Sequence, residues 1–170
     1  MSESKQMTPE PWLRGTLRDV AAVPRSVLHA LELAQEDLDK WCRPLTSEQL
    51  TASPCGLSPV AFHLRHIARS MDRLLTYAEG GRLQEAQVVA LRSELAPGSL
   101  HDTLFAELDA AFARSGERVR GLASGDLEAA RVVGEKLLPT TLGGLLVHLA
   151  EHTQRHVGQA ITTAKLVAAL

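Results

Sequence analysis

Four segments of the chain place apolar residues three and four positions apart, and this spacing constrains the fold more than any other feature. The segments cover residues 20–42, 58–79, 99–122 and 140–167. Apolar residues at such intervals share one side of an α-helix, which is then buried against neighbouring elements. No segment stands out with the alternating pattern of a strand. The sequence therefore predicts an all-α fold, a four-helix bundle that is mostly antiparallel with longer connections.

Residues that favour helix N-termini precede three of the four segments. Ser58 and Pro59 fit an N-cap followed by a proline at the first helical position. Ser99 fits the start of a capping pair before the third segment, and Thr140 or Thr141 fits the cap of the last. These residues support the boundaries that the apolar spacing predicts.

The connections between the long helices have weaker signals. Thr46 and Gln49 have the spacing of a capping box, which predicts a short helical turn that ends near Thr51. Residues 82–95 fit a short helix, although the apolar pattern there is weak. Residues 124–139 form a connection whose shape the sequence does not define.

Chain length and charge limit the number of domains and the classes of partner. The 170 residues suit one domain, so we expect a single bundle over 1–170 with a polar N-terminal extension over 1–15. The formal net charge of −2 leaves no basic surplus for phosphates, which argues against nucleic acid. No apolar run approaches the roughly 18 residues of a membrane span, and the polar N-terminus lacks a signal-peptide pattern. We therefore expect a soluble cytoplasmic protein with Cys42 and Cys55 as free thiols.

Histidine is the residue type that carries a chemical signal in this sequence. His148, His152 and His156 follow one another at intervals of four in the last helix, so neighbouring rings lie one turn apart. Two imidazoles so placed can bind one metal ion without distorting the backbone. On a helical wheel, His156 lies roughly 30° from the buried direction, His152 about 70° and His148 about 110°. His152 and His156 are therefore the pair that best faces the bundle interior.

The second long helix offers two further histidines, His63 and His66. His63 lies closer to the centre of the apolar stripe, whereas an open-ended bundle site draws its ligands from the edge of such a stripe. The spacing alone favours His63 slightly over His66. Three neutral imidazoles leave coordination positions free, where water becomes a nucleophile or a substrate thiol is ionised. His29 and His101 have no such partners and are expected at the surface.

Several short segments share a pattern with a known protein family. The most specific is residues 146–159, LVHLAEHTQRHVGQ, where two histidines four apart precede a Gly-Gln ending and Val157 stands where Arg is common. Weaker matches occur at residues 10–15, 45–50, 56–59 and 66–68. On these segments the chain resembles the DinB-like superfamily, which includes the YfiT-type metal-dependent enzymes.

This resemblance implies a divalent-metal site formed by His66, His152 and His156, with zinc or nickel as the usual metal. It selects His66 over His63, because the family's ligand is the histidine followed directly by an aliphatic residue and alanine. It also implies a homodimer and, in some relatives, a low-molecular-weight thiol as cofactor. His63 and His148 remain alternatives, either as groups that orient a ligand or as replacements for one.

Two classes of function fit these observations. The first is a metal-dependent enzyme that acts on a small molecule, either as a small-thiol S-transferase or as a hydrolase. The alternative is a non-catalytic dimeric helical protein of stress or regulation, with a structural or vestigial metal site. An open site with three protein ligands favours the enzyme, and a closed site with four favours the alternative. Four charged residues on the outer side of the second helix are expected to form a solvated face: Arg65, Arg69, Asp72 and Arg73.

Overall fold

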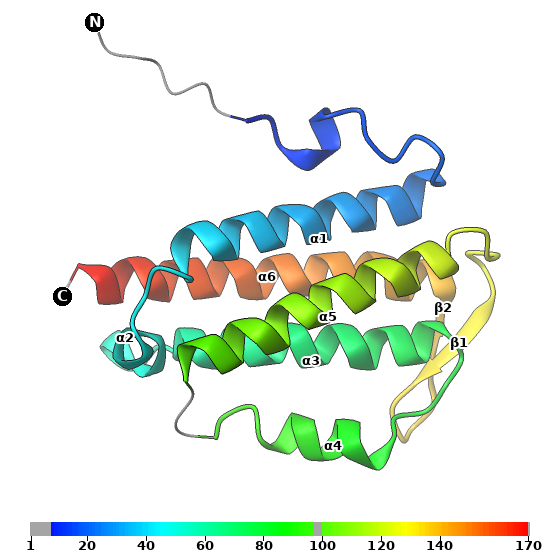
Figure 1. The fold of residues 1–170 in the computed structure, drawn as a ribbon. Helices are drawn as coiled ribbons and strands as arrows, with labels where there is room; N and C mark the ends of the chain where they lie inside the picture. Colours follow the sequence, from blue (N-terminus) through cyan, green and yellow to red (C-terminus); the bar gives the residue numbers. More distant parts are fainter. Residues whose placement is uncertain (1–7, 97–99, 170) are drawn as a thin grey trace, which may run out of the picture.

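The computed structural model describes residues 8–96 and 100–169, and four long helices form its framework (Figure 1). These helices are α1 (Ala22–Trp41), α3 (Val60–Ala78), α5 (His101–Gly121) and α6 (Leu142–Ala168). Each of them corresponds to one of the predicted amphipathic segments. The predicted four-helix bundle is therefore confirmed.

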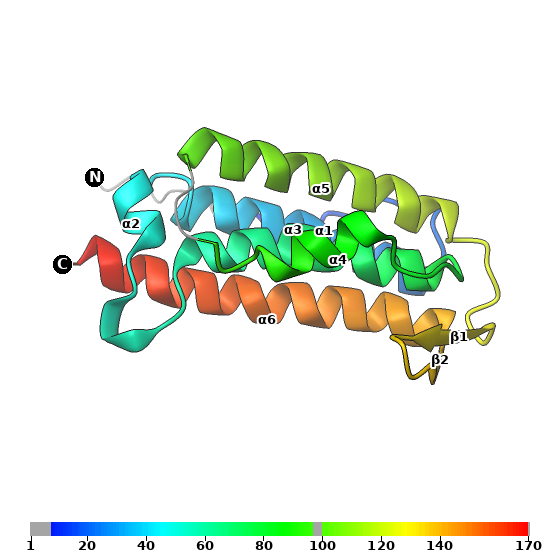
Figure 2. The same ribbon diagram turned by 90° about the horizontal axis from the view of Figure 1, so that it is seen from below.

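Each long helix has one parallel and one antiparallel neighbour. Figures 1 and 2 show α1 and α6 running in one direction, and α3 and α5 running in the other. Gln154 donates a hydrogen bond to the Ala30 carbonyl, and Lys165 lies over the ring of Trp41, so α6 advances in step with α1. In contrast, α3 packs antiparallel to α6 and α1 packs antiparallel to α5. Of these parallel pairs, α3 and α5 follow one another among the long helices, so they require a long connection, and this connection carries a further short helix.

The apolar stripes of the four helices meet in one core. Large side chains with at most 1% exposure fill it, among them Leu38, Leu64, Ile67, Met71, Leu108, Leu146 and Leu149. Burying a side chain of this size contributes roughly 1.5–3 kcal/mol, which is why the stripes determine how the helices face one another. The core thus fixes the orientation of the side chains at its edge, where the histidines lie.

The connection between α1 and α3 contains α2 (Ser47–Thr51) and a 3-10 turn, η2 (Pro54–Gly56). The predicted capping box at the start of α2 is confirmed. The backbone N–H of Gln49 donates to Oγ1 of Thr46 at 3.2 Å, and the backbone N–H of Thr46 donates to Oε1 of Gln49 at 3.0 Å. These two bonds satisfy N–H groups that the first helical turn cannot satisfy itself.

The start of α3 differs by one residue from the prediction. Pro59, with φ −59° and ψ 150°, is still extended, so the helix begins at Val60 and Pro59 takes the N-cap position. The prediction of Ser58 as the N-cap was therefore wrong. Instead, the Ser58 carbonyl accepts a hydrogen bond from Oγ1 of Thr163 at 3.3 Å, which links the entry of α3 to α6.

The predicted short helix in residues 82–95 is confirmed as α4 (Glu85–Arg92), which lies along the outer side of α3 (Figure 1). Ser99, the predicted cap of α5, lies outside the described residues, and α5 begins at His101 after Leu100.

A β-hairpin that the sequence did not predict precedes α6. Its strands β1 (Ala130–Val133) and β2 (Leu138–Thr141) are antiparallel, with Ala130 opposite Thr141. The strands are short and mostly exposed or half-buried, so they bury no continuous apolar face that would show as alternation. Thr141 ends the hairpin and caps α6, as predicted, because its Oγ1 accepts the N–H of Gly144 at 3.1 Å.

The described part of the predicted N-terminal extension packs on α1. It contains a 3-10 turn, η1 (Pro11–Leu13), and Arg14 forms ion pairs with Glu32 at 2.9 Å and Glu36 at 2.6 Å. Both cysteines are free, as predicted. Burial raises the pKa of Cys42 to about 12, which makes it a poor nucleophile. Across residues 8–96 and 100–169, no helix combines the length and the apolar character needed to cross a membrane.

Candidate metal centre

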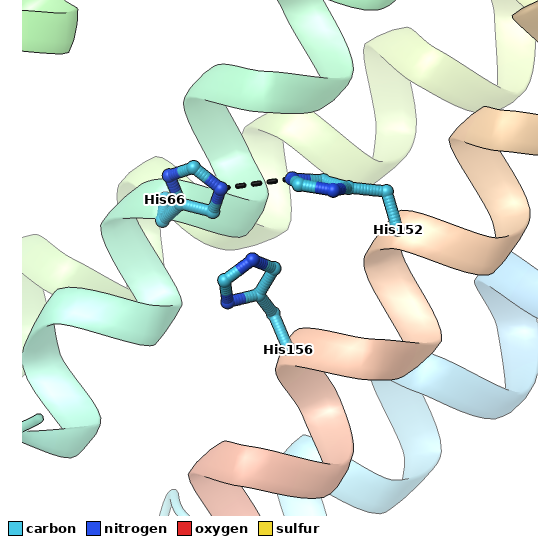
Figure 3. A group of neighbouring side chains, drawn as sticks. All are labelled: His66, His152 and His156. Carbon is cyan, nitrogen blue, oxygen red and sulfur yellow. Dashed lines mark hydrogen bonds between the residues drawn. The ribbon is translucent and has the colours of Figure 1, made fainter. Parts of the chain in front are cut away.

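Three histidines from α3 and α6 converge where these two helices lie side by side (Figure 3). His66 extends from α3, and His152 and His156 extend from successive turns of α6. Nε2 of His66 lies 2.8 Å from Nε2 of His152, and the ring centroids of His66 and His156 are 4.2 Å apart. One nitrogen from each of the three rings lies within 4.8 Å of the others. The structure thus brings together the three residues that the family resemblance selects.

The antiparallel packing of α3 and α6 explains this convergence. Moving along α3 from His63 to His66 corresponds to moving back along α6 from His156 to His152. Each histidine of α3 therefore faces one histidine of α6 across the contact between the helices. Phe62 covers the cluster, with its ring stacked on His66 at 5.5 Å between centroids.

His63 lies beside the cluster but belongs to a different contact. Its side chain is buried, as its place near the centre of the α3 stripe predicts. Its Nδ1 lies 3.1 Å from Nδ1 of His156, whereas Nε2 of His66 faces Nε2 of His152. His63 is therefore placed to orient the ring of His156.

Glu94, which the sequence did not single out, fixes the orientation of His66. One carboxylate oxygen, Oε2, lies 2.7 Å from Nδ1 of His66, and the other, Oε1, accepts a hydrogen bond from Arg73 at 2.7 Å. Burial alone would raise the pKa of Glu94, but the hydrogen bonds from His66 and Arg73 outweigh it and lower the pKa. The ionised carboxylate is placed to accept a proton from Nδ1, and Nε2 of His66 faces His152 on α6.

The cluster favours neutral imidazoles. Burial, together with the proximity of the other rings and of Arg155, lowers the pKa of His152 and of His156 to about 4. Burial is also the main cause that lowers the pKa of His63 to about 4, followed by His156 and His66. At neutral pH these rings keep nitrogen lone pairs free, which is the form that a metal ion requires.

The outer side of α3 is covered rather than solvated, so the prediction for its charged residues was wrong. Arg65 is 8% exposed and donates to the carbonyls of Glu94 at 3.1 Å and Ala96 at 2.8 Å. Arg69 donates to the Ala90 carbonyl at 2.8 Å. The stripe of arginines thus holds α4 and the residues after it on α3. This attachment brings Glu94 to His66.

The remaining histidines lie outside the group of three. His148 is half-buried, with its ring centroid 5.4 Å from that of His152. His29 is buried, contrary to the prediction, because the segment before α1 covers it and Oγ1 of Thr16 lies 3.1 Å from its Nε2. His101 is half-buried, with its Nε2 2.8 Å from a backbone carbonyl in the connection after α1.

The fold and the site together describe a helical-bundle protein with a candidate metal centre, formed by three histidines on two facing helices. A family model described as the DinB superfamily matches residues 30–160, which include all three histidines. The chain therefore belongs to the DinB superfamily. Comparisons with curated proteins and with solved structures found no significant match.

Proposed function

We propose that the protein is a metal-dependent enzyme that holds one divalent ion through His66, His152 and His156 and acts on a small molecule. The observation that carries this proposal is the convergence of one nitrogen from each of three imidazoles within 4.8 Å. Imidazole donors suit zinc and nickel. Three protein ligands leave at least one coordination position for water or substrate, as in catalytic zinc sites.

Two neighbouring residues support this role by fixing ring orientations. Glu94 accepts the Nδ1 proton of His66, and Nδ1 of His63 is placed to accept the Nδ1 proton of His156. In both ligands the Nε2 lone pair is then available. Partners of this kind are a regular feature of histidine-based metal sites, because they select the tautomer and hold the ring.

A bound divalent ion supplies Lewis acidity, which lowers the pKa of a coordinated water or thiol. Among the described residues, Glu94 is the carboxylate in contact with the cluster, and both of its oxygens are already engaged by His66 and Arg73. A hydrolase benefits from a free general base, whereas thiol transfer proceeds once the thiol is ionised. This arrangement favours a small-thiol S-transferase over a hydrolase.

The alternative is a non-catalytic helical protein with a structural or vestigial metal site. A structural zinc site normally has four protein ligands. In the part of the chain that the structure describes, the group with metal-binding spacing contains three residues. This number supports the enzyme over the alternative.

We also propose that the protein forms a homodimer through α1 and α6. The family resemblance implies this assembly, and both helices keep large apolar side chains partly exposed. Trp41 is 36% exposed, Leu166 40% and Val147 56%. Exposed apolar groups on neighbouring helices are a usual component of homodimer interfaces.

Metal analysis of protein purified without a nickel column tests the proposal. We expect about one divalent ion per chain in the wild type and none in the His152→Ala, His156→Ala double variant. His101→Ala serves as the control, because this histidine lies outside the group of three. Full metal retention in the double variant would overturn the site. With cobalt in the site, a small thiol should produce a sulfur-to-metal charge-transfer band, and its absence would exclude the S-transferase.

A further inference from the structure

A hollow of about 520 Å³ lies beside the histidine cluster, between the start of α3 and the second half of α6. Its lining includes Ser58, His63, Arg155, Gly158, Gln159 and Thr162. A hollow of this size is large enough for a small organic molecule. We refer to these six residues and the space that they surround as the α3–α6 hollow.

The hollow is connected to the histidine cluster through His63. This side chain lines the hollow, and its Nδ1 lies 3.1 Å from Nδ1 of His156. Arg155 also lines the hollow and directly precedes His156 in the chain. A molecule bound in the hollow would therefore lie next to the cluster and within reach of the positive charge of Arg155.

The charge of the lining has one sign. Arg155 is its charged residue, and none of the lining residues, all of them in the described part of the chain, is a carboxylate. Glu151, the ion-pair partner of Arg155, lies one helical turn away, outside the lining, and is exposed. The hydroxyl group of Ser58 and the amide of Gln159 add neutral donors, whereas the hydroxyl of Thr162 donates to the Gly158 carbonyl at 2.9 Å. A guanidinium surrounded by neutral donors is a recognition site for a carboxylate or a phosphate.

Gly158 lines the hollow without a side chain. A Cβ atom at this position would have no heavy atom within 4 Å, so neither steric crowding nor a positive φ requires a glycine here. A glycine within a helix is less favourable than an alanine. The free space above its backbone is therefore available to a ligand.

From these observations we infer that the α3–α6 hollow binds the anionic group of the substrate, a carboxylate or a phosphate, with Arg155 as its charge partner. The inference rests on the proposed function, because it takes the neighbouring histidines as the reaction centre. The ligand competes with Glu151 for the guanidinium of Arg155. The non-reacting end of the substrate is then held next to the cluster, while its reactive group faces the three histidines.

NMR titration of the full chain tests this inference, in the metal-free and the zinc-loaded forms. The probes are succinate and inorganic phosphate, which distinguish a carboxylate from a phosphate. In the wild type we expect at least one probe to shift the backbone amides of Gly158 and Gln159. Arg155→Met should weaken this binding about tenfold or more, since it removes a charge-assisted hydrogen bond.

Two substitutions of Gly158 distinguish a filled hollow from a general loss of folding. Gly158→Leu should abolish probe binding because its side chain fills the hollow, whereas Gly158→Ala should keep most of it. Glu151→Gln should strengthen binding, because it removes the competing carboxylate. Equal probe affinity in the wild type and Arg155→Met, or no amide shift with either probe at tens of millimolar, overturns the inference.

The two proposals fail separately. If the protein binds a probe but takes up no metal, the anion site is supported and the metal centre is contradicted. If the protein binds metal but neither probe, the metal centre is supported and the anion site is contradicted.

Discussion

Oε2 of Glu94, which lies just after the end of α4, is 2.7 Å from Nδ1 of His66 on α3. The same carboxylate accepts a hydrogen bond from Arg73, so both of its oxygens are held. His66 cannot turn away from α6 without breaking this half-buried hydrogen bond to a carboxylate. The orientation of one candidate ligand thus depends on a residue far from it in sequence.

Glu94→Gln is expected to weaken metal affinity about 10- to 100-fold, because an amide accepts the Nδ1 proton of His66 less strongly than a carboxylate. Competition with a coloured chelator measures the affinity. Glu107→Gln is the matched control, since Glu107 pairs with Arg69 on the same side of α3 but does not contact a histidine. If both variants lose metal affinity equally, the effect comes from weaker packing of the neighbouring elements on α3 and not from the contact between Glu94 and His66.

His63→Ala is expected to weaken metal binding about tenfold or more without abolishing it, because His156 loses the partner of its Nδ1. Isothermal titration with zinc measures the change. His148→Ala should have a smaller effect, since His148 lies outside the group of three. Complete loss of binding in His63→Ala would identify His63 as a ligand.

The stability of the metal-free protein is expected to fall as the pH falls from 6.5 towards 4. The pKa values of His63, His152 and His156 are lowered from 6.5 to about 4 in the folded protein. Between these pH values the unfolded chain binds more protons than the native state, so stability rises with pH in this window and is lost on acidification.

Thermal melts across this window measure the effect of the histidines. The His152→Gln, His156→Gln double variant should show a shallower decrease in Tm, because it no longer carries two of the groups that titrate differently in the two states. An unchanged slope in the double variant would assign the acid sensitivity to other residues.

The proposed homodimer should have about twice the chain mass of 18.4 kDa in sedimentation experiments at micromolar concentration. Leu166→Lys should shift the species towards the monomer, because it places a charge among the exposed apolar residues of α6. Val89→Lys is the control, since Val89 is 57% exposed on α4, away from α1 and α6. A monomer in the wild type would contradict the proposal.

The long helices could be predicted because each buries one continuous stripe. Ile67 and Met71 are both 0% exposed, and their spacing alone predicts the buried side of α3. The hairpin of residues 130–141 could not be predicted, because each of its strands has four residues and neither strand buries a side chain fully. The prediction of a solvated arginine stripe on α3 failed because sequence spacing cannot show that α4 covers it.

The candidate site was predictable where it depends on one helix. The interval of four between His152 and His156 places both on the same side of α6, and the structure brings both to His66. The choice between His63 and His66 depends on how α3 lies against α6, so the wheel could not make it. Glu94 gave no signal, because a single carboxylate in a segment of weak periodicity is indistinguishable from surface charge.

α4 and the residues that follow it are attached to α3 in part through their backbone. Arg65 and Arg69 bind carbonyl oxygens of Glu94, Ala96 and Ala90, and every amino acid supplies a carbonyl oxygen. Side chains in this segment can therefore change during evolution or in design while its docking to α3 persists. Gln87, Ser93 and Glu94 are exceptions, because their side chains also bond to α3: Gln87 donates to Asp72 and Thr76, Ser93 accepts from Arg69, and Glu94 contacts His66 and Arg73. New surface properties could thus be introduced beside the candidate reaction centre at little structural cost.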